Sequence, residues 1–181
     1  SINEEVVHGI PSKKRYINQG DIVSIDLGVI KDGYMSDCAR TTAIGRVDSA
    51  VKQLIDVTSE ALTRGISKVK AGCKTGDIGW AIQIFVEKHN FGVVRDFAGH
   101  GLGKNLHEEP EVPNFGKPGT GVELKENMVI AIEPMINLGG PDVRILSNGW
   151  TVVTADGLPS VHFEDTVVVT KDGFEILTSV E

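Results

Sequence analysis

Four acidic side chains interrupt apolar stretches of this sequence, and their surroundings point to metal chemistry. Asp26 lies in IVSIDLGVI, Asp37 in SDCARTT, Glu133 in MVIAIEPMI and Glu164 in FEDTVVVT. Burying an isolated carboxylate is unfavourable unless a positive partner meets it. Acids that lie close together repel one another unless they clasp cations. Hard divalent cations prefer carboxylate oxygen, and an imidazole extends the choice to manganese, iron, cobalt or zinc.

Two histidines lie in a glycine-rich segment that suits such a site. His100 and His107 belong to AGHGLGKNLHEEP, with glycine at positions 99, 101 and 103. Glycine lets the backbone approach a site closely. The segment lacks the Lys-Ser/Thr of a phosphate-binding loop. A lone histidine here is more often a hydrogen-bonded structural residue than a ligand, whereas a histidine combined with four acids is a specific arrangement.

The acids are expected to project from β-strands. GDIVSIDLGVI at 20–30 is rich in β-branched residues and predicts a strand, KDG at 31–33 is a hairpin-turn signal, and 34–44 is the returning partner. Two more strands are predicted at 127–137 and 160–170, and FEILTSV at the end of the chain predicts another.

Two helices are predicted between these strands. Apolar residues recur at helical spacing after Asp48, a good N-cap, until Gly72. A second helix is predicted from a cap at Thr75 to Gly92. Two segments complete the prediction: 93–123, as strand and loop, and 138–158, as a long loop.

The two predicted strand pairs that carry the acids are similar to one another in sequence. GDIVSIDLGVI and NMVIAIEPMI superpose with Asp26 under Glu133, and each is followed by a strand with a second acid, Asp37 or Glu164. Chance similarity between apolar strands is the competing explanation. A true repeat predicts an α+β fold whose antiparallel sheet has pseudo-two-fold symmetry.

Composition narrows the class of protein. The 181 residues, 40% hydrophobic and 24% charged, are typical of one soluble catalytic domain spanning 1–181. A net charge of −7 argues against nucleic-acid binding, and Lys13-Lys14-Arg15 is interpreted as a solvated loop. No apolar run predicts a membrane span or a signal peptide. Only Cys38 and Cys73 are present, which favours a reducing, cytoplasmic compartment.

Six motifs together resemble the methionine aminopeptidases, a branch of the pita-bread metallopeptidases. The motifs are VVHGIP at 6–11, IVSIDLGVIKDGYMSD at 22–37, GHGLGKNLHEEP at 99–110, IAIEPMI at 130–136, NGW at 148–150 and FEDTVVVT at 163–170. Their order and spacing match the family over nearly the whole chain. The resemblance implies the pita-bread fold, with helices on the outer face of the sheet. The short segment between Glu133 and Glu164 resembles the type I subfamily.

The resemblance also implies two divalent metal ions, cobalt, manganese, iron or zinc. Asp26 would lie on one metal and His100 and Glu133 mainly on the other, with Asp37 and Glu164 bridging. Metals in such sites lie about 3.5–4 Å apart and share a hydroxide that attacks the peptide bond.

Roles for the remaining site residues follow from the same resemblance. Glu133 matches a proton shuttle, and His107 matches a residue that hydrogen-bonds the substrate and the tetrahedral intermediate. His8 matches a histidine that faces the substrate amide, although a buried histidine bonded to backbone is the structural alternative. Trp150 matches a wall of the methionine pocket, and Leu106 stands where many members have Phe.

The implied activity is removal of N-terminal methionine from peptides and nascent chains. A cytoplasmic monomer with ribosome association, and with no DNA or membrane partner, is expected. Two alternatives stay open: a catalytically impaired pita-bread protein that only binds partners, and a Pro-directed relative of the prolidase or aminopeptidase P type.

Two departures from the family pattern bear on the site. Bacterial members usually read Gln-x-Glu-His-Thr around the last ligand, whereas this chain reads His162-Phe163-Glu164-Asp165-Thr166. A hydrogen bond to the site, metal ligation and a plain surface position are the three interpretations of His162. Family members also have several tens of residues before SINEEVVHGIP, and some of these residues line the methionine pocket.

Overall fold

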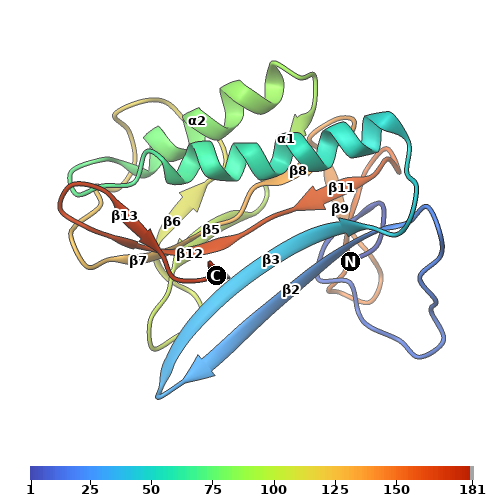
Figure 1. Ribbon diagram of the computed structural model, residues 1–181, viewed down its shortest axis with the longest axis horizontal. Helices are drawn as coiled ribbons and strands as arrows, with labels where there is room; N and C mark the ends of the chain where they lie inside the picture. The colour runs from blue at the N-terminus through green and yellow to red at the C-terminus, as the bar shows by residue number, and fades with distance from the viewer. Residues whose placement is uncertain (180–181) are drawn as a thin grey trace.

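Two helices cover one face of a set of antiparallel strands (Figure 1). The computed structural model describes residues 1–179. Helices α1 (Ser49–Ile66) and α2 (Thr75–Glu87) lie side by side above the strands. Their fully buried side chains, such as Leu54, Ile78 and Ile82, form one hydrophobic core with the strands beneath them. This burial of apolar area supplies the main stabilisation of the helical layer.

Three small sheets form the layer under the helices. The largest sheet has the strand order β13 (Phe174–Ile176), β12 (Asp165–Val169), β7 (Val129–Ile132), β5 (Ala98–Gly101), β6 (Glu108–Pro113). The second sheet has the order β11 (Ser160–His162), β8 (Met135–Asn137), β4 (Gly92–Val93). The third has the order β1 (Glu5–Val7), β10 (Val152–Thr154), β9 (Val143–Ile145). Every pairing between the strands of residues 1–179 is antiparallel. The predicted α+β class is therefore confirmed.

A long hairpin forms the opposite side of the molecule. Strands β2 (Ile22–Lys31) and β3 (Tyr34–Ala43) are joined by Asp32 and Gly33, whose φ angles are 52° and 81°. Two consecutive positive φ angles are the requirement of a type I′ turn, so the prediction from KDG is confirmed. Two isolated bridges connect the hairpin to the rest of the chain, one from Val23 to Ile2 and one from Ala39 to Glu164.

Two of the predicted strands are broken at an acidic residue. Glu133-Pro134 separates β7 from β8, and Phe163-Glu164 separates β11 from β12. Because β7 pairs with β12 and β8 pairs with β11, the chain passes from one sheet to another at both breaks. The predicted continuous strands at 127–137 and 160–170 are therefore wrong at these points. Pro134 contributes to the break because it cannot donate to the ladder.

The helix ends also differ from the prediction. The first helix begins after Asp48 as predicted but ends at Ile66, well before Gly72. In the second, Thr75 is already helical, and its hydroxyl accepts a hydrogen bond from the Val122 N–H at 3.2 Å instead of capping the helix. Asp77 Oδ2 accepts the Lys74 N–H at 2.8 Å in place of a cap at Thr75.

Three remaining segments complete the comparison. The second helix ends at Glu87 instead of Gly92. The predicted loop at 138–158 contains strands β9 and β10. The last predicted strand is shorter than FEILTSV, and Val180 of that motif lies outside the described residues. Within residues 1–179 no helix has the length and hydropathy needed to cross a membrane.

Candidate metal centre

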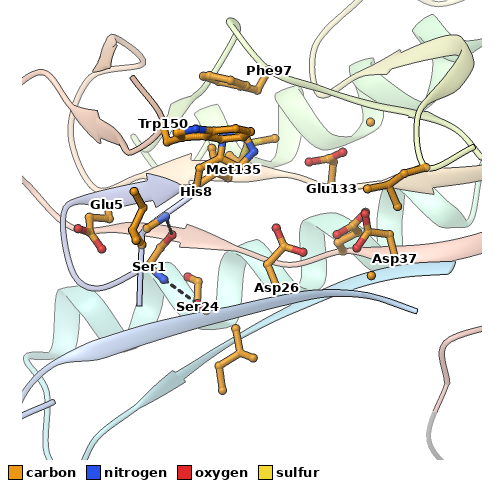
Figure 2. A pocket seen from close by; sticks show the side chains of 18 of the residues that line it. Ser1, Glu5, His8, Ser24, Asp26, Asp37, Phe97, Glu133, Met135 and Trp150 are labelled. Atoms are coloured by element: carbon orange, nitrogen blue, oxygen red, sulfur yellow. Dashed lines mark hydrogen bonds between the residues drawn. The ribbon is translucent and has the colours of Figure 1, made fainter. Parts of the chain in front are cut away.

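The predicted site residues line one cavity of about 1250 Å³ between the hairpin and the remaining strands. The cavity is lined by all nine of them: His8, Asp26, Asp37, His100, Leu106, His107, Glu133, Trp150 and Glu164. Figure 2 shows two ends, with the carboxylates of Asp26, Asp37 and Glu133 at one and the rings of His8 and Trp150 at the other. The acidic end suits cations, and the aromatic end suits an apolar group.

Three of the predicted ligands meet closely at the acidic end. Asp37 from β3, His100 from β5 and Glu164 from the break before β12 each offer a ligand atom, and these atoms lie within 4.8 Å of one another. Their exposed fractions are 8%, 8% and 2%. Three buried ligand atoms at this separation are the donor set of a metal ion that prefers oxygen and imidazole nitrogen.

The carboxylates of this cluster lack the partners that a metal-free site would need. Asp37 Oδ1 and Glu164 Oε1 are buried and have no hydrogen-bond partner in the described part of the chain. Burial raises the pKa of Glu164 to about 10, and the neighbouring carboxylates of Glu133 and Asp37 add to the increase. Burial also raises the pKa of Asp37, with Asp26 as the next cause. A divalent cation resolves both problems, so these residues fit a metal.

The hydrogen bond of the His100 ring favours the same interpretation. Its Nδ1 lies 2.9 Å from the carbonyl oxygen of Gly101, and a carbonyl can only accept, so Nδ1 carries the proton. Nε2 is the ring nitrogen left to bind a metal, and it is 3.5 Å from Glu133 Oε1. A metal ion between these two atoms would accept an electron pair from each.

Asp26 lies beside the cluster at a more exposed position. It lies in β2, two positions beyond the buried Ser24, and is exposed. Its carboxylate points from the hairpin into the cavity, toward the side where Asp37 and Glu133 lie (Figure 2). Asp26 thus lies near the three-residue cluster without being part of it.

Hydrogen bonds that the sequence did not indicate hold the ligands in place. Thr166 Oγ1 accepts the Asp37 N–H at 2.9 Å and donates to the Asp37 carbonyl at 2.7 Å. Arg40 donates to the Glu164 carbonyl, and Asn114 Nδ2 donates to the Glu133 carbonyl at 3.0 Å. No local pattern reveals these contacts, because Thr166 is 129 positions from Asp37 and Arg40 is 124 from Glu164.

The glycines that flank His100 are required by close packing of β5. A Cβ on Gly99 would lie 2.2 Å from the Ala131 carbonyl oxygen, and one on Gly101 would lie 2.1 Å from that of Glu109. Both distances are far below any real contact. The expectation that glycine permits close backbone approach around His100 is therefore confirmed.

Aromatic rings form the other end of the cavity. The His8 ring makes edge contacts with Phe97 and Trp150, at centroid distances of 6.0 and 5.9 Å. Trp150 is 64% exposed, and fully buried Met135 also lines the cavity. His8 is not the buried histidine of the structural alternative, because it is exposed and its φ is 59°. A strained backbone at a cavity wall is typical of functional positions.

His107 and Leu106 lie between the two ends. The His107 ring makes an edge contact with His100, with 4.3 Å between ring centroids. The His107 side chain is exposed to the cavity, so its nitrogens are accessible to a ligand. Leu106 packs over Gly28 of the hairpin, where an added Cβ would lie 3.4 Å from Leu106 Cδ1.

His162 and Asp165, the two residues near Glu164 that depart from the family pattern, have different environments. A surface position for His162 is wrong, because only 1% of the residue is exposed and Nε2 lies 3.5 Å from Glu133 Oε2. Asp165 accepts hydrogen bonds from Arg40 at 2.5 Å and Thr178 at 2.7 Å. Asp165 therefore pairs with the cationic side chain of Arg40, and it is not among the residues that line the cavity.

The fold and the ligand cluster together define a metal-dependent peptidase. The chain belongs to Metallopeptidase family M24, whose sequence model matches residues 1–171. It is 51% identical to the methionine aminopeptidase of Clostridium acetobutylicum over 181 residues, which are 100% of this chain and 72% of that relative. The crystal structure of methionine aminopeptidase from Thermotoga maritima superposes with a TM-score of 0.97 at 47% identity, and the match covers 99% of this chain and 72% of that chain.

A Pro-directed member of the same structural group is more distant. The prolidase from Pyrococcus furiosus superposes with a TM-score of 0.75 at 27% identity, and the match covers 99% of this chain and 48% of that chain. The predicted pita-bread fold is confirmed by the higher scores of the methionine aminopeptidases. The difference in identity separates this chain from the Pro-directed alternative.

Proposed function

We propose that this chain is a metal-dependent methionine aminopeptidase that acts on N-terminal Met peptides and nascent chains. One observation carries the proposal: buried, unpaired carboxylate oxygens of Asp37 and Glu164 meet His100 in a cavity whose other end is aromatic. A hydrolytic centre and an apolar side-chain pocket therefore lie within reach of one substrate.

Two divalent cations are the proposed cofactors. Asp26, Asp37, Glu133 and Glu164 contribute four negative charges, which two divalent cations neutralise. Asp37 and Glu164 are the proposed shared ligands, with His100 and Glu133 on one side and Asp26 on the other. Cations held there would acidify a water molecule and polarise the scissile carbonyl. Cobalt, manganese, iron and zinc are the ions that this mixed oxygen and imidazole set prefers.

The chain's own groups supply the proton transfer. Glu133 Oε2 is the proposed acceptor for the proton of the attacking water, and it would return that proton to the leaving amine. This carboxylate is only 13% exposed, so bulk water does not compete for the proton. The Asn114 side chain holds the Glu133 backbone, which keeps the carboxylate at the cavity wall.

Two histidines and an apolar pocket would position the substrate. His107 would donate to the scissile carbonyl and stabilise its negative charge as the tetrahedral intermediate forms. His8, at the far wall, would contact the substrate amide. Trp150 and Leu106 are the proposed walls of the methionine pocket, because both are apolar and line the same cavity as the ligand cluster.

The cytoplasm is the proposed location. Cys38 and Cys73 are both free thiols, as expected in a reducing compartment. Nascent chains, which carry the initiator methionine, are also found there.

Methionine release from Met-Ala-Ser tests the proposal directly. The protein is stripped with EDTA, reloaded with Mn²⁺ or Co²⁺, and assayed beside the Pro-directed substrate Ala-Pro-Ser. We expect metal-dependent release of methionine and no cleavage of Ala-Pro-Ser. The His107→Ala variant should retain metal and lose about 10²–10³ in kcat. Methionine release without metal, bound metal without release, or a fully active His107→Ala protein would each contradict the proposal.

A further inference from the structure

His162 is a buried polar residue that the proposed mechanism does not use. Only 1% of the residue is exposed, and its Nε2 has no hydrogen-bond partner closer than 3.5 Å within residues 1–179. A buried polar atom without a hydrogen-bond partner destabilises the folded protein. The position of this imidazole therefore needs an explanation beyond packing.

The backbone of His162 is held rigidly under the cavity. Thr41 Oγ1 accepts the His162 N–H at 3.1 Å and donates to the His162 carbonyl at 2.8 Å. Ser24 Oγ lies 2.7 Å from the same Thr41 oxygen, which connects both strands of the hairpin to this point. His162 also pairs with Met135 between β11 and β8. The backbone that carries the ring is therefore fixed, and the Glu133 carboxylate lies within reach of the ring.

Glu133 has an imidazole on each of its carboxylate oxygens. Oε1 is 3.5 Å from His100 Nε2, and Oε2 is 3.5 Å from His162 Nε2. The two rings differ in their hydrogen bonds. His100 carries a proton on Nδ1 and donates it to the Gly101 carbonyl. His162 Nε2 can carry a proton and donate it toward Oε2. A shift of a few tenths of an ångström would bring that contact to hydrogen-bond length.

We propose that His162 is a positioning residue, whose Nε2–H fixes the carboxylate of Glu133 so that Oε1 is directed at the metal held by His100. The proposal rests on the proposed function of the same site. It requires only that Nε2 carries a proton, so it holds for the neutral and the charged ring alike. Groups that orient a metal ligand change metal affinity by about 10–100-fold when they are removed.

A matched pair of substitutions separates donation from packing. Gln and Met have similar length, and the Gln amide nitrogen reaches about as far as His Nε2, but only Gln can donate. His162→Gln should bind Mn²⁺ within about 3-fold of wild type, and His162→Met should bind about 10–100-fold more weakly. Titration calorimetry on the EDTA-stripped proteins measures both affinities without relying on turnover. Thermal melting of the stripped proteins reports folding, and His162→Leu replaces His162→Met if the latter does not fold.

Each result decides the inference. His162→Met binding Mn²⁺ as tightly as wild type would overturn it, because the donor would then have no effect. His162→Gln as weak as His162→Met would also overturn it and would indicate that the imidazole itself binds the metal. If wild type binds Mn²⁺ with the same affinity as all variants, only this inference fails. If wild type binds no Mn²⁺, the proposed function fails as well.

Discussion

Replacing Glu164 with Gln should stabilise the protein in the absence of metal. Glu164 is 2% exposed, Oε1 has no partner among the described residues, and Glu133 and Asp37 lie close by. These surroundings raise the pKa of Glu164 from an ordinary 4.5 to about 10. Gln has nearly the same shape and no charge, so the variant removes the electrostatic penalty and leaves the packing unchanged.

The size of the effect follows from the linkage between protonation and folding. Between pH 4.5 and about 10 the unfolded chain has an ionised Glu164 and the folded chain a protonated one. Folding therefore takes up a proton, and the free energy of unfolding falls as pH rises through this window. At pH 7 the accumulated penalty is about 3 kcal/mol. Glu164→Gln should recover most of it, and the pH dependence of its stability should be correspondingly shallower.

Urea unfolding in EDTA at several pH values between 5 and 8 measures the difference. Glu175→Gln, at an exposed position of β13, is the matched control and should change the free energy of unfolding by less than about 0.5 kcal/mol. Added Mn²⁺ should reverse the order, because ligand binding to the folded state stabilises wild type. A Glu164→Gln protein that is less stable than wild type in EDTA would refute the account of this carboxylate.

Three further predictions concern the supports of the site and of α2. Asp37→Asn should abolish tight metal binding, measured by elemental analysis after dialysis, because it removes a buried carboxylate from the ligand cluster; retained stoichiometric metal would contradict this. Thr166→Val should lower the free energy of unfolding by about 1–3 kcal/mol, because it removes both hydrogen bonds to the Asp37 backbone; urea unfolding would show no change if those bonds were unimportant. Asp77→Ala should lower it by about 1 kcal/mol at pH 7. Hydrogen bonds from the Lys74 and Gly119 N–H groups lower the pKa of Asp77, so this contribution is present above the pKa of the unfolded carboxyl and is lost as pH falls through the folded value. A difference between wild type and Asp77→Ala that does not shrink toward pH 3 would contradict this reasoning.

Local sequence patterns were sufficient to predict the hairpin and to single out the acidic residues of the site. β-branched runs on either side of KDG predicted β2 and β3, because a two-residue turn leaves one register for the pair. Glu133 was found because a carboxylate among apolar residues requires a positive partner. Both signals depend only on residues adjacent in sequence.

No local sequence pattern indicated the strand breaks at Glu133 and Glu164 or the hydrogen bonds that hold the ligands. A β-branched run predicts a strand without saying which sheet each half joins, so the transitions at Glu133 and Glu164 were missed. The bonds from Thr166 to Asp37 and from Arg40 to Glu164 join residues more than a hundred positions apart. The burial of His162 was also missed, because its position depends on the hairpin that covers β11 through Thr41.

Anomalous diffraction from crystals grown with Mn²⁺ tests the central claim most directly. The account predicts anomalous peaks in the cavity with Asp37, His100 and Glu164 as ligands, and with Glu133 and Asp26 completing the coordination of two ions. Crystals with ample Mn²⁺ that show no peak at this position, or carboxylates that point apart and bind nothing, would contradict it.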